Sequence, residues 1–136
     1  MTENFFTAAP RRKLLFFAVC FMLAVYGCGR RTENIAGVEI PIPKNMTKNA
    51  DAVIEPVIGV QDGQVSYQGK VTAKDIFTFY QEIMAADGWQ PTAQFSDKPN
   101  RIAYTKGNRL VLIRYDKAEN DVMILTILVG MLAPAK

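Results

Sequence analysis

Arg101, Arg109 and Arg114, with Tyr104 between them, are the residues of this 136-residue chain whose types and spacing best suit binding chemistry. Guanidinium groups donate paired hydrogen bonds to carboxylates and phosphates, and an aromatic ring adds a cation–π contact. These residues could therefore hold an anionic polymer or lipid head groups. The simpler explanation is that basic side chains cover the exposed face of a strand. If the domain has a functional surface, we expect it at these four residues.

Groups that commonly perform catalysis are scarce. The chain contains no histidine, which removes the commonest general base and the commonest metal ligand. Its two cysteines, Cys20 and Cys28, precede the predicted domain, and serine occurs only at Ser66 and Ser96. The carboxylates between residues 116 and 121 fall in a predicted turn that lacks the spacing and the glycine of an EF-hand loop. We therefore expect no enzymatic activity, no cofactor and no metal site.

The N-terminal segment has the organisation of a secretory signal. Basic residues occupy positions 11–13, an apolar run follows over residues 14–26, and the run ends at Gly27-Cys28. The uncharged stretch between Lys13 and Arg30 is shorter than the roughly 20 residues that a helix needs to cross a bilayer. The segment is therefore expected to direct export rather than to span a membrane.

The end of this segment, Val25-Tyr26-Gly27-Cys28, resembles the lipobox of bacterial lipoproteins, with an aliphatic residue at −3, a small residue at −1 and the acylated cysteine at +1. The resemblance implies that residues 1–27 are removed and that Cys28 carries the lipid. In that family an aspartate directly after the cysteine often marks retention in the inner membrane. Gly29 follows here, which favours the outer membrane and a domain facing the periplasm. An uncleaved signal anchor and a cleaved signal without lipid are the alternatives.

The remaining charge and the polar linker set the domain boundaries. Removing residues 1–27 takes away three basic residues and one acidic residue, which lowers the formal charge from +3 to +1 and gives no reason to expect nucleic acid as a partner. Residues 28–50 are mostly polar and contain two prolines, and they are predicted to be a flexible tether. Alternatively, Ile40 and Ile42 lie against the domain as an edge segment. Residues 51–136 then form a single domain with a modest core.

One helix is predicted from Thr72 to Asp87. Thr72 and Asp75 can form a capping box, and Gly88 can end the helix, which would bring Trp89 onto Met84. Apolar residues recur at three- and four-residue spacing. The predicted buried stripe consists of Ile76, Phe77, Tyr80, Ile83 and Met84.

The other elements are predicted to be strands. Their ranges are 52–61, 64–71, 89–95, 101–106, 109–115 and 121–130, with tight turns at Asp62-Gly63 and Gly107-Asn108. Pro56 suggests that the first strand lies at an edge. Residues 122–129 are apolar on both faces, which indicates a central strand. The order ββαββββ predicts an α+β fold, an antiparallel sheet of five to six strands with one helix packed on one face.

Short motifs make the mature chain similar to small bacterial envelope lipoproteins, among them Ile40–Lys44, Gly88-Trp89 and Ile102–Lys106. The resemblance implies a fold and a location, but no reaction. We expect a non-catalytic binding or assembly module that is attached to the membrane by its lipid and docks on another envelope protein. The alternative is a carrier or sensor of a small hydrophobic ligand held between helix and sheet. That ligand would contact Phe77, Tyr80, Met84 and Trp89.

Overall fold

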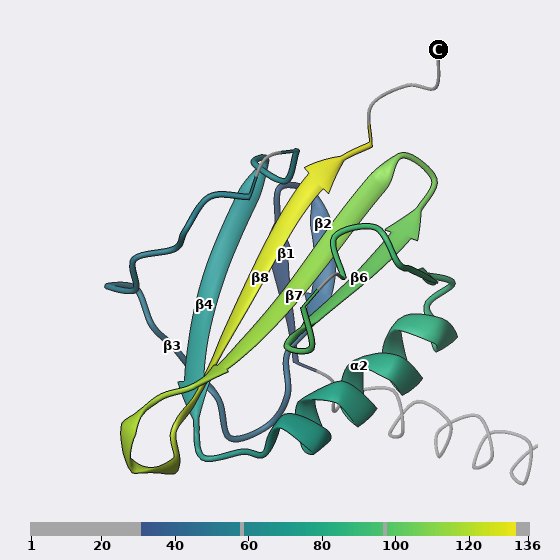
Figure 1. Ribbon diagram of the computed structural model, residues 1–136. Helices are drawn as coiled ribbons and strands as arrows, with labels where there is room; N and C mark the ends of the chain where they lie inside the picture. Colours follow the sequence, from purple (N-terminus) through teal and green to yellow (C-terminus); the bar gives the residue numbers. More distant parts are fainter. Residues whose placement is uncertain (1–30, 58, 97, 133–136) are drawn as a thin grey trace, which may run out of the picture. The chain divides into compact units, whose positions relative to one another are not determined.

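The computed structural model describes residues 31–57, 59–96 and 98–132. They form one α-helix and eight strands in two antiparallel sheets, which confirms the α+β class (Figure 1). The larger sheet has six strands in the order β3-β4-β8-β7-β6-β5. Their bounds are β3 Thr47–Lys48, β4 Gly63–Gly69, β8 Met123–Met131, β7 Arg109–Lys117, β6 Arg101–Lys106 and β5 Gln90–Thr92. The short strands β3 and β5 therefore form the two edges.

Strand β8 lies at the centre of the larger sheet, as its sequence predicts. It pairs with β4 on one side and with β7 on the other, and its residues 125–130 are buried on both faces. The predicted hairpin across Gly107-Asn108 is also confirmed, because β6 and β7 pair from Lys106↔Arg109 to Arg101↔Arg114. A short 3-10 turn, η1 (Glu119–Asp121), lies between β7 and β8. Both faces of the larger sheet are thus apolar at its centre, and both must be covered by other parts of the chain.

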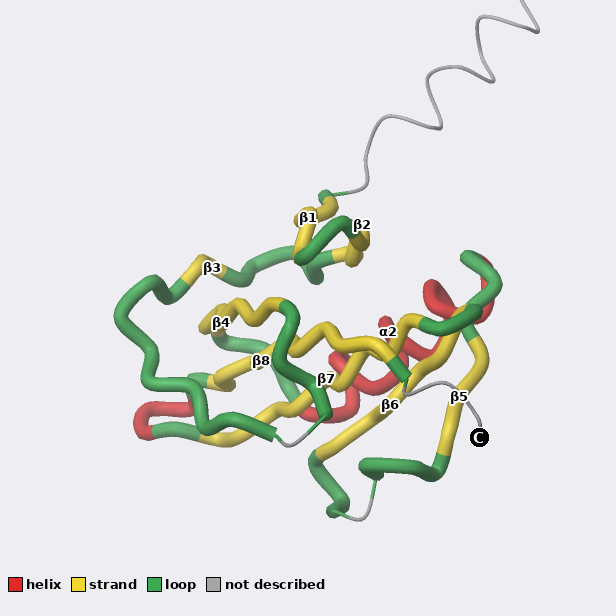
Figure 2. The backbone as a smooth tube through the Cα atoms, turned by 90° about the horizontal axis from the view of Figure 1, so that it is seen from above, coloured by secondary structure: helices red, strands yellow, loops and turns green. Residues whose placement is uncertain are grey.

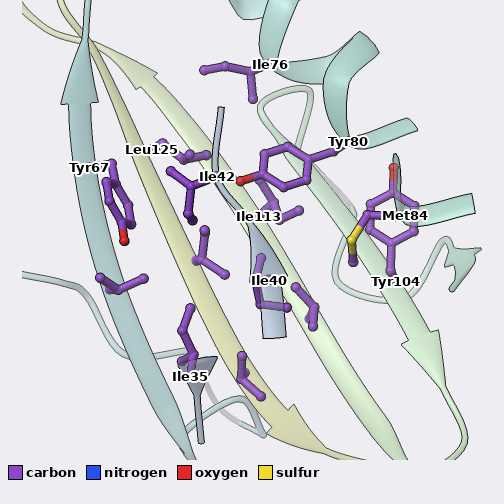
Figure 3. Close-up of a cluster of buried hydrophobic side chains, with 14 of the residues drawn as sticks. Ile35, Ile40, Ile42, Tyr67, Ile76, Tyr80, Met84, Tyr104, Ile113 and Leu125 are labelled. Carbon is purple, nitrogen blue, oxygen red and sulfur yellow. The ribbon is translucent and has the colours of Figure 1, made fainter. Parts of the chain in front are cut away.

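The first face of the sheet is covered by helix α2 (Ala73–Ala86) and by a hairpin of β1 (Thr32–Ile35) and β2 (Val38–Pro41). Side chains from the helix, the hairpin and the sheet form one buried cluster (Figure 3). Its members include Ile35 and Ile40 from the hairpin, Tyr80 from α2, and Tyr67 and Leu125 from the sheet. The hydroxyl of Tyr80 donates a 2.9 Å hydrogen bond to the carbonyl oxygen of Pro41, which joins helix and hairpin.

The ends of α2 follow local rules. The Thr72 side chain accepts a hydrogen bond from the Asp75 amide, and the Asp75 carboxylate accepts one from the Thr72 amide, so the predicted capping box is present. At the other end Gly88 has a φ of 86°, and the Trp89 amide donates to the Met84 carbonyl at 2.9 Å. One part of the predicted stripe is wrong, since Phe77 is 43% exposed.

The predicted tether over residues 28–50 is wrong from Arg31 onward. These residues form β1, β2 and β3, and Ile40, Ile42 and Met46 are buried in the main cluster. The physical reason is that α2 covers only part of the apolar first face, and the hairpin buries much of what remains. The alternative reading of Ile40 and Ile42 as docked residues is the correct one. The folded unit therefore begins at Arg31 rather than at residue 51.

The predicted strand over residues 52–61 is also wrong. Where the structure describes this stretch, at residues 52–57 and 59–61, it forms only an isolated bridge between Val57 and Val60. Strand β4 pairs with β8 instead of forming a hairpin across Asp62-Gly63. The segment packs on the second face of the sheet, where Val60 joins a smaller cluster with Leu112 and Leu128. In Figure 2 the loops before β4 and between β5 and β6 lie on one side of the sheet, and β1 and β2 lie on the other. The apolar residues that suggested an edge strand thus belong to a loop that covers the second face.

Candidate binding pocket

The structure does not gather the four predicted site residues on one surface. Tyr104 is buried in the main cluster on the first face, with 3% of its surface exposed. Arg109 also serves the first face, because its guanidinium donates to the carbonyl oxygen of Ala36 in the β1–β2 turn. Only Arg101 and Arg114 lie together, as a directly paired position of β6 and β7. The predicted four-residue surface is therefore wrong, and a two-arginine site remains.

Arg101 and Arg114 belong to a polar row across the second face. Directly opposed residues of an antiparallel pair point to the same face. Ser66 pairs with Thr126, Thr126 pairs with Arg114, and Arg114 pairs with Arg101. Ser66 and Thr126 are each 2% exposed, whereas the arginines lie toward the outer part of the row. The row marks where the second face changes from apolar packing to polar contacts.

The two arginines line a polar pocket of about 350 Å³. Its described lining comes from three separate segments: the loop before β4, the loop before β6, and the paired strands β6 and β7. The lining residues are Val53, Glu55, Lys98, Asn100, Arg101, Arg114 and Asp116. Sequence reasoning missed most of them, because it treated the hairpin of residues 101–115 in isolation. The available signals were the closeness in sequence of Lys98 and Asn100 to Arg101, and of Asp116 to Arg114.

Two carboxylates hold Arg114 in position. Its Nε lies 3.2 Å from Oδ2 of Asp116, and its Nη1 lies 3.9 Å from Oε2 of Glu55. Asp116 is fixed in turn by Asn100, whose Nδ2 donates a 2.6 Å hydrogen bond to Oδ1 of Asp116. The Arg114 side chain is 13% exposed, while Glu55 is 85% exposed. Arg114 is thus a preorganised cation, and one of its two partners reaches it from the solvent.

The charges of the pocket are suited to binding an anion. Its described lining carries three cationic side chains and two carboxylates, a net charge of +1. It lacks a serine, threonine or tyrosine beside a base, and so offers no activated nucleophile among the described lining residues. Arginine donors arranged in a fixed fork match the geometry of a carboxylate or a phosphate.

A second polar cluster, formed by Arg31, Glu33, Lys48 and Tyr67, lies at the first face. The Lys48 ammonium and the Tyr67 hydroxyl donate hydrogen bonds to the two oxygens of Glu33, at 2.7 and 2.8 Å. These bonds hold the pKa of the Glu33 carboxyl below its usual value, and burial with the Glu33 contact raises the pKa of Tyr67 to about 12. Arg31 lies 5.3 Å above the Tyr67 ring. Each member joins the hairpin or β3 to β4, so this cluster is best explained as structural.

The space expected for a hydrophobic ligand between helix and sheet is occupied by side chains. Tyr80 and Met84 are fully buried in the main cluster, Trp89 is 6% exposed, and Phe77 points outward. A pocket of about 490 Å³ lies instead beside the start of α2, lined by Val71, Thr72, Lys117, Met123 and neighbouring residues. The amides of the helix start are partly satisfied there by the capping box. These positions do not bring the four predicted ligand contacts together around an open space.

Two further observations concern location and relatives. Cys28, the predicted lipidation site, lies outside the described residues, and no helix in the described ranges is long and apolar enough to cross a membrane. Comparison of the chain with protein-family models, curated proteins and solved structures finds no match.

Proposed function

We propose that this protein is a lipid-anchored, non-catalytic binding module of the bacterial cell envelope, which docks on another envelope component through the Arg101–Arg114 pocket. The anchor is Cys28, acylated after removal of residues 1–27, and the outer membrane is the expected site because Gly29 follows the cysteine. The observation that carries the proposal is the position of the pocket relative to the first strand. The pocket opens on the second face, and β1 lies on the first.

The short connection between the proposed anchor and the fold bears on which face of the domain points away from the membrane. Strand β1 begins at Thr32, four residues after Cys28, and an extended chain covers at most about 3.5 Å per residue. The start of β1 would therefore lie within about 14 Å of the acylated cysteine. A domain held so closely by its first face turns its second face away from the bilayer. The pocket is then presented to the compartment in which a partner would be found.

Anchoring also makes weak recognition sufficient. A pocket with one net positive charge and a volume of about 350 Å³ supplies only a few strong contacts. A lipid anchor confines this protein to one surface, which raises its effective concentration toward an envelope partner held close to that surface and compensates for a modest affinity. The function is thus suited to assembly or docking rather than to tight capture of a soluble molecule.

The proposal is tested by crosslinking in intact cells followed by mass spectrometry of the purified protein. We expect a reproducible envelope protein that is lost in Cys28→Ser and reduced in Arg101→Gln. Lys74→Gln is the matched control, because Lys74 is an exposed cation on α2, on the other face of the sheet. Partner capture that is equal in all three variants would reject the proposal. The intact mass of membrane-extracted protein should show a chain that begins at acylated Cys28, and a mass that retains residues 1–27 would reject the anchor.

A further inference from the structure

We infer that the pocket binds a carboxylate group of its partner, and that Glu55 occupies this place on Arg114 as an internal substitute. The class of partner, an envelope protein, rests on the proposed function. That protein would present an acidic side chain or a C-terminal carboxylate. The chemical type of the bound group, a carboxylate, rests on the geometry around Arg114. An experiment can therefore disprove the proposed function without disproving carboxylate binding, and the reverse.

The two carboxylates at Arg114 differ in how firmly they are held. Asp116 belongs to strand β7, contacts Arg114 at 3.2 Å, and receives a 2.6 Å hydrogen bond from Asn100. Glu55 lies in the loop before β4, contacts Arg114 only at 3.9 Å, and is 85% exposed. An exposed ion pair at this distance contributes little to stability. Asp116 is thus part of the site, and Glu55 is a carboxylate that can leave it.

The segment that carries Glu55 can move without breaking strand pairing. The described residues of 52–61 form no strand, and the bridge among them joins Val57 to Val60 within the same loop. The loop is attached to the second face through Ile54, Val57 and Val60, which are apolar contacts on either side of Glu55. The Glu55 side chain can therefore swing into solvent while the loop stays attached.

The group already at Arg114 favours a carboxylate over a phosphate dianion, because one carboxylate can replace another without a change in net charge. With Glu55 in place, the described lining has a net charge of +1, and with Glu55 withdrawn it has +2 because the remaining carboxylate is Asp116. Replacing Glu55 by one external carboxylate restores the original balance, whereas a dianion at this site would also face Asp116, which stays beside Arg114. A guanidinium fork and a planar carboxylate also match in shape. The occupant already present in the structure is itself a carboxylate.

A neighbouring side chain adds an apolar contact to the pocket. Val53 lines its wall and is 95% exposed, so its apolar surface is open to a ligand. A carboxylate that approaches Arg114 would bring its own aliphatic stem past this position. The favoured ligand group is therefore a carboxylate attached to an apolar segment of polypeptide.

The test uses the full acylated chain in detergent micelles and follows the arginine Nε–H signals by NMR. Sodium acetate is the probe, sodium chloride at equal ionic strength is the control, and inorganic phosphate is the competing class. We expect acetate to shift the Arg114 signal saturably in the millimolar range, which corresponds to about −4 kcal/mol. Glu55→Gln should tighten acetate binding about two- to five-fold, the range of an exposed ion pair. Arg101→Gln should weaken it.

Each outcome decides the inference. Equal shifts with acetate and chloride, tighter binding of phosphate than of acetate, or unchanged acetate affinity in Glu55→Gln would overturn it. Glu55→Gln alters an exposed residue, so the test does not depend on a variant that threatens folding. Acetate binding without any cellular partner would leave the inference standing and reject the proposed function. Capture of a cellular partner by a protein that does not bind acetate would support the proposed function and overturn the inference. An acetylated peptide with a free C-terminus, compared with its amidated form, then distinguishes a terminal carboxylate from an acidic side chain.

Discussion

The hydroxyl of Tyr67 on β4 donates a 2.8 Å hydrogen bond to Oε2 of Glu33 on β1. Tyr67 has no exposed surface, and Glu33 also receives the Lys48 ammonium at 2.7 Å. The bond spans 34 residues of sequence and connects the N-terminal hairpin to the main sheet. Removal of this bond therefore tests whether residues 31–48 are an integral part of the fold.

Replacing Tyr67 by phenylalanine should destabilise the protein by about 1 to 2 kcal/mol, because a hydrogen bond to a charged acceptor is lost while the ring stays packed. Urea unfolding at neutral pH measures the effect. Tyr115→Phe is the matched control, since the Tyr115 hydroxyl donates to Pro99 at an exposed position, and its cost should stay below about 0.5 kcal/mol. Equal losses in the two variants would contradict a structural role for the Glu33 bond.

The free energy of unfolding should fall at acid pH, partly because the Glu33 carboxylate becomes protonated. Hydrogen bonds from Lys48 and Tyr67 lower the pKa of this carboxyl in the folded protein from its usual 4.5. A lowered folded-state pKa gives stability that is present above pH 4.5 and is lost as the pH falls through the lowered value. Glu33→Gln should therefore be less stable than the wild type at pH 7, and the difference should shrink below about pH 4.5. Unfolding curves across this range test it, and a constant difference would show that Glu33 does not contribute by ionisation.

A chain that begins at residue 51 should not fold, whereas one that begins at Arg31 should. The shorter chain loses Ile40, Ile42 and Met46, which are 0%, 3% and 3% exposed in the whole fold. Their loss uncovers the apolar surface around Tyr67 and Tyr80, and each buried aliphatic side chain contributes about 2 kcal/mol. Amide dispersion in NMR spectra of the two chains gives the answer. A well-dispersed spectrum from the shorter chain would mean that the hairpin is an accessory.

Gly69→Ala should cost at least about 2 kcal/mol, because an added Cβ would overlap the backbone oxygen of Asn45 and overpacked sites relax poorly. Gly107→Ala is the control. An added Cβ at Gly107 has no neighbour within 4 Å, so only its φ of 59° matters, at about 1 kcal/mol. Thermal unfolding compares the two variants. A smaller effect at Gly69 than at Gly107 would contradict the close crossing of residues 45–46 over β4.

The features that sequence predicted correctly are those decided by neighbours in the chain. The capping box of Thr72 and Asp75 and the turn at Gly88 depend on residues within a few positions, and so does the hairpin across residues 107–108. The central position of β8 followed from apolar residues on both of its faces.

The errors arose where distant segments compete for the same surface. Residues 52–61 are rich in Val and Ile, which predicts an edge strand, yet β4 pairs with β8, and the segment covers the second face. The prolines at 41 and 43 suggested an unpaired tether, but a separate two-stranded hairpin accepts Pro41 at the end of β2. For the binding pocket, sequence identified Arg101 and Arg114. It missed Glu55, because only folding brings the loop before β4 to this place, and it missed Asp116, because the sequence predicts a turn at that residue, which belongs to β7.

The two edges of the main sheet have a consequence for behaviour at high surface density. Strand β3 is only two residues long, and β5 is three residues long with Pro91 in its middle. Proline removes an amide donor, and so short an edge offers few bonds to an incoming strand. Molecules confined to a bilayer meet one another far more often than molecules in free solution. If the proposed lipid anchor holds the protein at a bilayer, such short edges would let it accumulate there without edge-to-edge pairing of its sheets into fibrils.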